Sequence, residues 1–149
     1  AVRTIAVINQ KGGCGKTTTS INLAATFAEL ERKTLLVDMD PQAHCALGLA
    51  VPEAQIDVSI GDAMLSDQPV DFTEFIWQIS SKLDLAPSTV ALAGVERKLA
   101  EIDQREHRLA QTLKPARDQY EFCIVDCPPN IGLLTFNAMC AADLVIIPV

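Results

Sequence analysis

The sequence predicts an α/β fold, a doubly wound, mostly parallel sheet with helices on both faces. Short apolar runs alternate with longer helical or mixed segments, as they do when helices connect parallel strands. The runs are continuously apolar, which is typical of strands that are covered on both faces. A glycine-rich stretch follows the first run and precedes an amphipathic segment, and this context is that of a phosphate-binding loop between a strand and a helix.

We expect five strands, at residues 4–8, 34–37, 83–86, 122–125 and 144–147. The last run has the character of a central strand but lacks a following helix and a neighbour, so we expect a fold truncated after its fifth strand. By length, residues 1–149 form a single domain.

The helices are predicted from apolar spacing. After the glycine-rich stretch, Leu23, Phe27 and Leu30 recur at helical intervals and predict a helix that packs on the sheet. Short helices are expected at residues 60–65 and around 72–79. From Val95 onward a helical stripe continues, with the charged run "ERKLAEIDQREHR" on its solvated side and a kink or restart at Pro115. The apolar members of that stripe are Val95, Leu99, Ile102, Leu109, Leu113 and Ala116.

Composition limits the function classes. The hydrophobic content of 49% supports a folded core, and the sequence shows neither a membrane span nor a secretory signal, which makes the cytoplasm the expected location. The formal charge of −7 argues against a broad basic face that holds nucleic acid. The odd cysteine number without C-x-x-C spacing fits neither a disulfide framework nor a zinc site, and we interpret Cys123 and Cys127 as small buried hydrophobic residues. The other cysteines are Cys14, Cys45 and Cys140.

The stretch "NQKGGCGKTTTS" indicates a phosphate-binding loop. Glycines at positions 12, 13 and 15 let the backbone N–H groups approach an anion closely. Lys16 supplies a charge for the terminal phosphates, Thr17 a hydroxyl suited to Mg²⁺, and the following helix directs its positive dipole end at the same place. The loop is a variant, because residue 10 is Gln where the pattern G-x-x-x-x-G-K-[ST] needs Gly. The alternative, a glycine-rich turn without a ligand, is disfavoured by the strand before it and the helix after it.

Three acidic residues follow predicted strands. Asp38 and Asp40 end the second run and Asp126 ends the fourth, so in a parallel sheet all three lie at the edge where ligands bind. Together with Thr17 they are expected to converge on one Mg²⁺. A turn or cap role is the alternative for each acid taken alone. The two histidines suggest no general base: His107 lies in the charged run, and His44 is a loop residue beside the acids.

Three segments, "NQKGGCGKTTTSINLAA", "LLVDMDPQ" and "IVDCPPNIGLLTFNA", resemble the deviant Walker A, Walker A′ and Walker B segments of ParA-type ATPases. "LDLAPSTVALAGVE" also resembles the third strand of that family and the helix after it. The Asn-Gln pair before Lys11 and the Asp-Pro-Gln that begins at Asp40 resemble ParA more than its relative MinD. The sequence departs from the family pattern at Cys14, at "AHC" after "DPQ", at Glu31 and at Asn130.

The resemblance implies ATP and Mg²⁺ as cofactors and a role for each matching residue. Thr17 would ligate Mg²⁺ directly, Asp126 would hold it through water, and Asp38 would support the metal and Lys16. The implied catalytic residues are Lys16 on the β and γ phosphates, Lys11 reaching the partner's nucleotide across a dimer interface, and Asp40 orienting the attacking water. The implied nucleotide-binding residues are Lys11, Gly12, Gly13, Cys14, Gly15, Lys16, Thr17 and Thr18.

The resemblance further implies an ATP-dependent switch that hydrolyses ATP, forms a homodimer on ATP and partitions DNA or a protein cargo over the nucleoid. Non-specific DNA would bind through the missing C-terminal part, and a ParB-like or cargo adaptor protein would stimulate hydrolysis. A membrane is not among the implied partners. Two alternatives stay open. A MinD-like membrane switch would need a C-terminal amphipathic helix, and a metabolic or cluster-carrying enzyme could share the loop.

Overall fold

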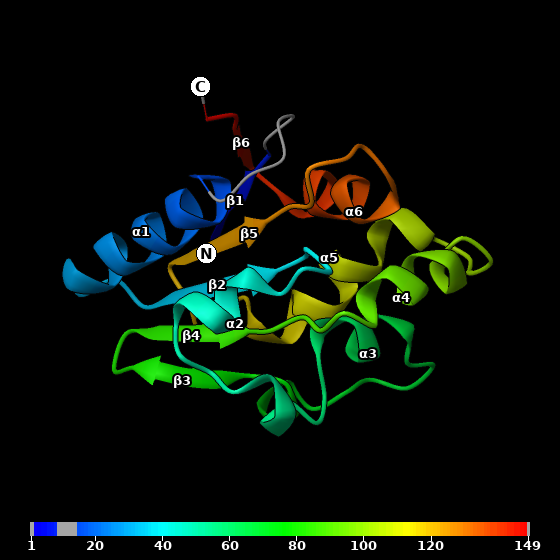
Figure 1. Ribbon diagram of the computed structural model, residues 1–149, viewed down its shortest axis with the longest axis horizontal. Helices are drawn as coiled ribbons and strands as arrows, with labels where there is room; N and C mark the ends of the chain where they lie inside the picture. The colour runs from blue at the N-terminus through cyan, green and yellow to red at the C-terminus, as the bar shows by residue number, and fades with distance from the viewer. Residues whose placement is uncertain (1, 9–14, 149) are drawn as a thin grey trace.

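The computed structural model describes residues 2–8 and 15–148, which form one six-stranded sheet with helices on both faces (Figure 1). The sheet order is β3-β4-β2-β5-β1-β6. The strands are β1 (Arg3–Val7), β2 (Thr34–Asp38), β3 (Trp77–Ser80), β4 (Leu83–Ala86), β5 (Phe122–Asp126) and β6 (Leu144–Ile146). The helices are α1 (Gly15–Glu29), α2 (His44–Gly48), α3 (Ile60–Leu65), α4 (Leu92–Leu99), α5 (Arg108–Leu113) and α6 (Leu133–Ala141). Four 3₁₀ turns are η1 (Glu53–Gln55), η2 (Phe72–Glu74), η3 (Arg105–His107) and η4 (Lys114–Ala116).

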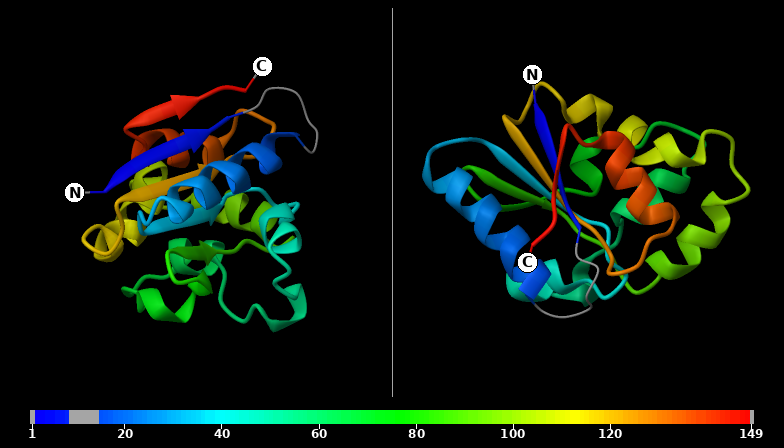
Figure 2. Two further views of the ribbon diagram at one scale, coloured as in Figure 1. Left: turned by 90° about the vertical axis from the view of Figure 1, so that its left-hand side faces the viewer. Right: turned by 90° about the horizontal axis from the view of Figure 1, so that it is seen from above.

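The sheet separates two apolar layers, because successive side chains on a strand point to opposite faces. Leu36 and Ile124 belong to the layer under α1 and α2, whereas Leu35 and Val125 belong to the layer under α3 to α6. Seen from above, α1 lies on one side of the sheet and α4, α5 and α6 on the other (Figure 2). The predicted doubly wound, mostly parallel fold is therefore confirmed.

The expected helix around residues 72–79 is wrong. The chain forms η2 there and then β3, which pairs antiparallel with β4 at the sheet edge and brings the sheet to six strands rather than five. Phe75, Trp77 and Ile79 are apolar at every second position, which is the strand period. Phe72 and Phe75 are three residues apart and meet edge to face in the core, which matches the 3₁₀ period.

The helical stripe from Val95 is buried except for the half-buried Ile102, but it is divided among α4, α5 and η4 instead of lying on one helix. α4 ends at Leu99, and Gln104 adopts a left-handed φ of 57° that redirects the chain into η3 and α5. The restart at Pro115 is confirmed, since α5 ends at Leu113 and η4 begins with the proline in its first turn. The helix at residues 60–65 is also confirmed, with a capping box at its start.

The end of α1 is a Schellman motif whose left-handed residue is Glu31. The N–H of Arg32 donates to the Phe27 carbonyl and that of Glu31 to the Ala28 carbonyl, both at 3.0 Å. Glu31 has a φ of 63°, a conformation that glycine adopts without strain. Leu30 lies past the end of α1 and is 64% exposed, so the expected apolar face of this helix stops at Phe27 and Ala28.

Replacing Glu31 with glycine is expected to stabilise the protein by about 1 kcal/mol, because relief of the left-handed strain exceeds the added entropy of the unfolded chain. Glu31→Ala keeps the strained φ and serves as the matched control. Urea unfolding of the three proteins measures the difference. A Glu31→Gly protein no more stable than Glu31→Ala would contradict the assigned strain.

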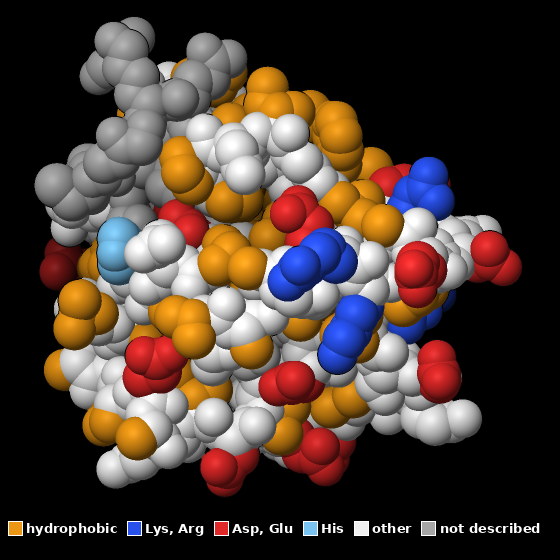
Figure 3. Space-filling view, turned by 45° about the vertical axis from the view of Figure 1, so that its right-hand side comes forward, with side chains coloured by type: hydrophobic (Ala, Val, Ile, Leu, Met, Phe, Trp, Pro, Cys, Tyr) orange, Lys and Arg blue, Asp and Glu red, His pale blue; other side chains and the backbone are white. Residues whose placement is uncertain are grey.

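Apolar side chains remain exposed on β6 and α6. Among the described strands, β6 pairs with β1 alone, and Leu144 and Val145 on it are 56% and 40% exposed. Phe136 and Met139 on α6 are similarly exposed, and Figure 3 shows hydrophobic side chains gathered along the upper edge of the molecule. In the described part of the chain, no helix has the length and apolar character needed to cross a bilayer.

Candidate functional site

Two buried carboxylates face each other at the carboxyl ends of neighbouring strands. Asp38 is the last residue of β2 and Asp126 the last of β5, and the two are direct partners in the parallel register. Val7, the last residue of β1, pairs with Asp126 from the other side. Both carboxylates have no exposed surface, so the ends of three adjacent strands enclose them.

Side chains from α1 and α2 complete this cluster. Ser20 Oγ of α1 donates a hydrogen bond to Asp126 Oδ1 at 2.7 Å. From α2, Cys45 Sγ lies 3.5 Å from Asp126 Oδ2, and the Cys45 N–H donates to Asp38 Oδ2 at 3.3 Å. The ligand atoms of Asp38, Cys45 and Asp126 all lie within 4.8 Å of one another, as in a group that could hold a metal ion. The second turn of α1 is thereby fixed beside Asp126.

The electrostatics of the cluster favour a cation. Burial, and then repulsion by Asp126, raise the pKa of Asp38 to about 7. Burial and the same two acids raise the pKa of the Cys45 thiol well above its usual value, so the thiol stays protonated and donates to Asp126. Two hard carboxylates with a protonated thiol between them suit Mg²⁺ better than a thiophilic metal. The donor set of the described residues therefore fits the predicted magnesium.

In the absence of Mg²⁺ and nucleotide, Asp38 is expected to make stability fall as pH rises from about 4 to about 7. In this window the folded state holds the Asp38 proton and the unfolded chain has released it, so the free energy of unfolding decreases by up to about 1.4 kcal/mol per pH unit. Asp38→Asn removes this contribution, whereas Asp118→Asn at an exposed position should keep it. Urea unfolding in a chelator across this pH range gives the slopes, and equal slopes for Asp38→Asn and wild type would contradict the assigned burial.

Asp40 lies near this group but outside it. β2 ends at Asp38, so Asp40 belongs to the turn that follows, where its N–H donates to Asp38 Oδ1 at 2.9 Å. Its own Oδ1 accepts the Gln42 N–H, and its carbonyl accepts the Ser88 hydroxyl. The expected convergence of three acids is therefore found for Asp38 and Asp126, while Asp40 supports Asp38 through the backbone.

The phosphate loop is described only from its helical end. Gly15, Lys16, Thr17 and Thr18 form the first turn of α1, and nothing is described of the side chains of Lys16 and Thr17. The predicted positions Lys11, Gly12, Gly13 and Cys14 lie outside the described residues.

Sequence reasoning missed Cys45 as a member of the site. The signal in the sequence was its place seven residues after Asp38, but only the turn of Asp40 and the left-handed Ala43 bring it back onto the acids. His44 was expected in a loop, but it is the first residue of α2. Its side chain is exposed, His107 lies 3.6 Å from Glu106, and neither histidine joins the cluster. Cys123 and Cys127 are buried, as predicted.

Comparisons with known proteins identify the family. A family model described as an AAA domain matches residues 2–149. The chromosome partitioning protein ParA of Myxococcus xanthus is 48% identical over 98% of the chain and 51% of its own length. The sporulation initiation inhibitor protein Soj of Bacillus subtilis is 43% identical over 97% of the chain and 57% of its own length.

Among solved structures, a protein described as cobyrinic acid a,c-diamide synthase from Mycobacterium smegmatis, with bound ATP analogue and magnesium, superimposes with a TM-score of 0.94. It is 36% identical, and the match covers 100% of this chain and 60% of that one. The chain thus spans roughly half the length of the curated relatives named above. By these matches and by its carboxylate pair beside the start of α1, the chain belongs to the AAA domain family of this model, among its ParA-type members.

Proposed function

We propose that this protein is an ATP-dependent molecular switch of the ParA type, which binds and hydrolyses ATP with Mg²⁺. One observation carries the proposal: Asp38 and Asp126 face each other, fully buried, beside the first turns of α1. Parallel α/β sheets bind ligands at this edge, and the amino end of a helix favours phosphate. The structural relative with bound ATP analogue and magnesium supports the same assignment.

Each residue of the site then has a definite task. Thr17 and Asp126 hold the metal ion, Asp126 through water, and Asp38 supports it. The metal ion, when bound, neutralises charge on the transferred phosphoryl group. Lys16 contacts the terminal phosphates, Asp40 orients the attacking water, and Lys11 reaches the nucleotide of a partner subunit. Residues 1–149 form one P-loop ATPase domain, the N-terminal part of the family fold, and ATP is cradled by Lys11, Gly12, Gly13, Cys14, Gly15, Lys16, Thr17 and Thr18.

The proposal extends to the whole protein. It forms a homodimer on ATP and partitions DNA or a protein cargo over the nucleoid in the cytoplasm. A ParB-like or adaptor protein stimulates hydrolysis, and non-specific DNA binds a C-terminal part beyond this chain. The names of the two curated relatives, a chromosome partitioning protein and a sporulation initiation inhibitor, support this class of function.

A metabolic enzyme that uses the same loop is the second candidate, favoured by the name of the structural relative from Mycobacterium smegmatis. A metabolic enzyme would hydrolyse ATP only in step with an acceptor substrate, whereas a switch hydrolyses it with water alone. A MinD-like positioning ATPase differs in binding lipid vesicles. Phosphate release from the full-length protein with ATP and Mg²⁺ alone, with DNA and with vesicles separates the three.

Lys16→Ala in the full-length protein is expected to weaken binding of Mg²⁺ and ATP at least about tenfold, because it removes a charge-assisted contact with the terminal phosphates. Calorimetric titration with a non-hydrolysable ATP analogue measures the affinity. Lys98→Ala, which removes an equal charge from the exposed face of α4, is the matched control and should bind as wild type does. Unchanged affinity in Lys16→Ala would remove this lysine from its assigned role.

A further inference from the structure

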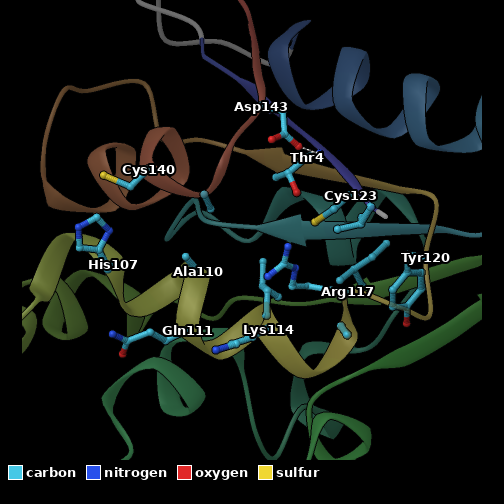
Figure 4. A pocket seen from close by; sticks show the side chains of 15 residues that line it. Thr4, His107, Ala110, Gln111, Lys114, Arg117, Tyr120, Cys123, Cys140 and Asp143 are labelled. Atoms are coloured by element: carbon cyan, nitrogen blue, oxygen red, sulfur yellow. Dashed lines mark hydrogen bonds between the residues drawn. The ribbon is translucent and has the colours of Figure 1, made fainter.

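A cavity of about 360 Å³ lies near the amino ends of the strands, whereas the carboxylate cluster lies at their carboxyl ends (Figure 4). Its floor includes Thr4, Leu35 and Cys123, each the second residue of its strand, whereas Asp38 and Asp126 end β2 and β5. With a rise of roughly 3.3 Å per residue, the floor is about 10 Å from those acids along the strands. The cavity is therefore separate from the proposed nucleotide site.

The inner surface of the cavity combines apolar and polar side chains in similar proportion. Leu35, Leu113 and Ala116 line it, with Ala110 from α5 and Ala141 from the end of α6. Tyr120 presents its ring, because its hydroxyl donates to Asp84 Oδ2 at 2.5 Å, and Figure 4 shows this hydroxyl turned away from the middle of the cavity. A volume of this size is typical of small-molecule sites.

The rim carries an excess of positive charge. Lys114 and Arg117 line the cavity from η4 and the residue after it, and neither side chain forms an ion pair within the described parts of the chain. The facing carboxylate is Asp143, whose Oδ2 accepts the Thr4 N–H at 2.9 Å and is thereby held at the start of β1. His107 also lines the cavity, and its Nε2 lies 3.6 Å from Glu106 Oε1. Lys114 and Arg117 are thus two exposed cations against one carboxylate in the cavity lining, in a chain of formal charge −7.

We propose that this cavity binds a small amphipathic carboxylate, with its apolar body over Ala110 and Ala141 and its carboxylate at Arg117 and Lys114. The planar guanidinium suits a carboxylate because two parallel N–H donors match its two oxygens. The apolar body contributes by leaving water for the apolar part of the cavity surface, which the alanines and the Tyr120 ring provide. The site needs neither ATP nor Mg²⁺.

Calorimetric titration of the full-length protein with octanoate tests this site. The uncharged probe of the same length is 1-octanol. We expect one octanoate per chain and octanol binding about tenfold weaker, since it lacks the charge-assisted contact. Arg117→Gln should weaken octanoate about tenfold and leave octanol unchanged. Arg97→Gln, an equal charge change on exposed α4 outside the cavity, should alter neither.

Filling the cavity provides an independent variant. Ala110→Leu should abolish binding of both probes while ATP-analogue binding, measured on the same sample, shows that the protein is folded. Absence of saturable octanoate binding to the wild-type protein would overturn the proposal. So would wild-type affinity in Ala110→Leu or equal affinities for octanoate and octanol.

Discussion

Asp126→Asn in the full-length protein is expected to lower the rate of Mg²⁺-dependent ATP hydrolysis by about 100-fold, because the water-mediated hold on the metal is lost. The amide has the same shape, but its nitrogen cannot accept the hydrogen bonds that Ser20 and Cys45 donate to the two carboxylate oxygens. Phosphate release at saturating ATP across a range of Mg²⁺ concentrations measures the loss, which higher Mg²⁺ should partly recover.

Without metal, the same variant should keep its stability although it loses activity. Removing the Asp126 charge relieves its repulsion of Asp38 and so offsets the hydrogen bond lost at the amide nitrogen, and at pH 8 in a chelator the variant should be about as stable as wild type. Asp118→Asn, at an exposed position two residues after η4, is the control and should change neither property. Wild-type hydrolysis by Asp126→Asn would contradict the metal assignment, and a large loss of stability would contradict the electrostatic account.

The second large effect separates Lys11 from Asp40. Lys11→Ala should still bind ATP on its own subunit but should fail to form the ATP dimer and fail to turn over, because the lysine serves the nucleotide of the partner subunit. Asp40→Ala should accumulate an ATP-bound dimer that hydrolyses roughly 100-fold more slowly, because water is no longer positioned. Sedimentation with ATP, combined with phosphate release, distinguishes the two outcomes.

A structural role of Asp40 must be separated from a catalytic one. Its Oδ1 accepts the Gln42 N–H, so alanine also removes a turn hydrogen bond. Asp40→Asn keeps an acceptor for that N–H and serves as the matched variant, and it should be as slow as alanine if the charge positions water. A Lys11→Ala protein that dimerises and hydrolyses normally would mark this loop as an ordinary phosphate loop.

The strands and the two facing acids could be predicted because they depend on local patterns. A continuous apolar run closed by Asp needs no distant partner to be recognised, and parallel pairing then brings Asp38 and Asp126 to one edge. β3 was missed because Phe72 and Phe75, just before it, have a spacing that fits an α-helix as well as a 3₁₀ turn. The residues that follow become a strand because they pair with β4.

Cys45 and the distal cavity could not be predicted for a different reason. Cys45 reaches Asp126 only because Asp40 caps a turn and Ala43 adopts a φ of 56°, which alanine's own preference disfavours. The cavity depends on how the end of α6 sits relative to η4 over the sheet, which sequence spacing does not determine. Such features arise from tertiary contacts between elements that are far apart in the chain.

The central claim is that ATP and its metal bind at the carboxyl edge of the sheet, beside Asp38 and Asp126. Manganese in place of Mg²⁺ tests it through paramagnetic relaxation of backbone amides in the full-length protein. With ATP present, relaxation should be strong at the amides of Asp38 and Asp126 and should fall steeply toward Arg3 and Thr34, at the other ends of β1 and β2, about 13 Å away along each strand. Equal relaxation at both edges, or an effect centred on Arg3 and Thr34, would contradict the account.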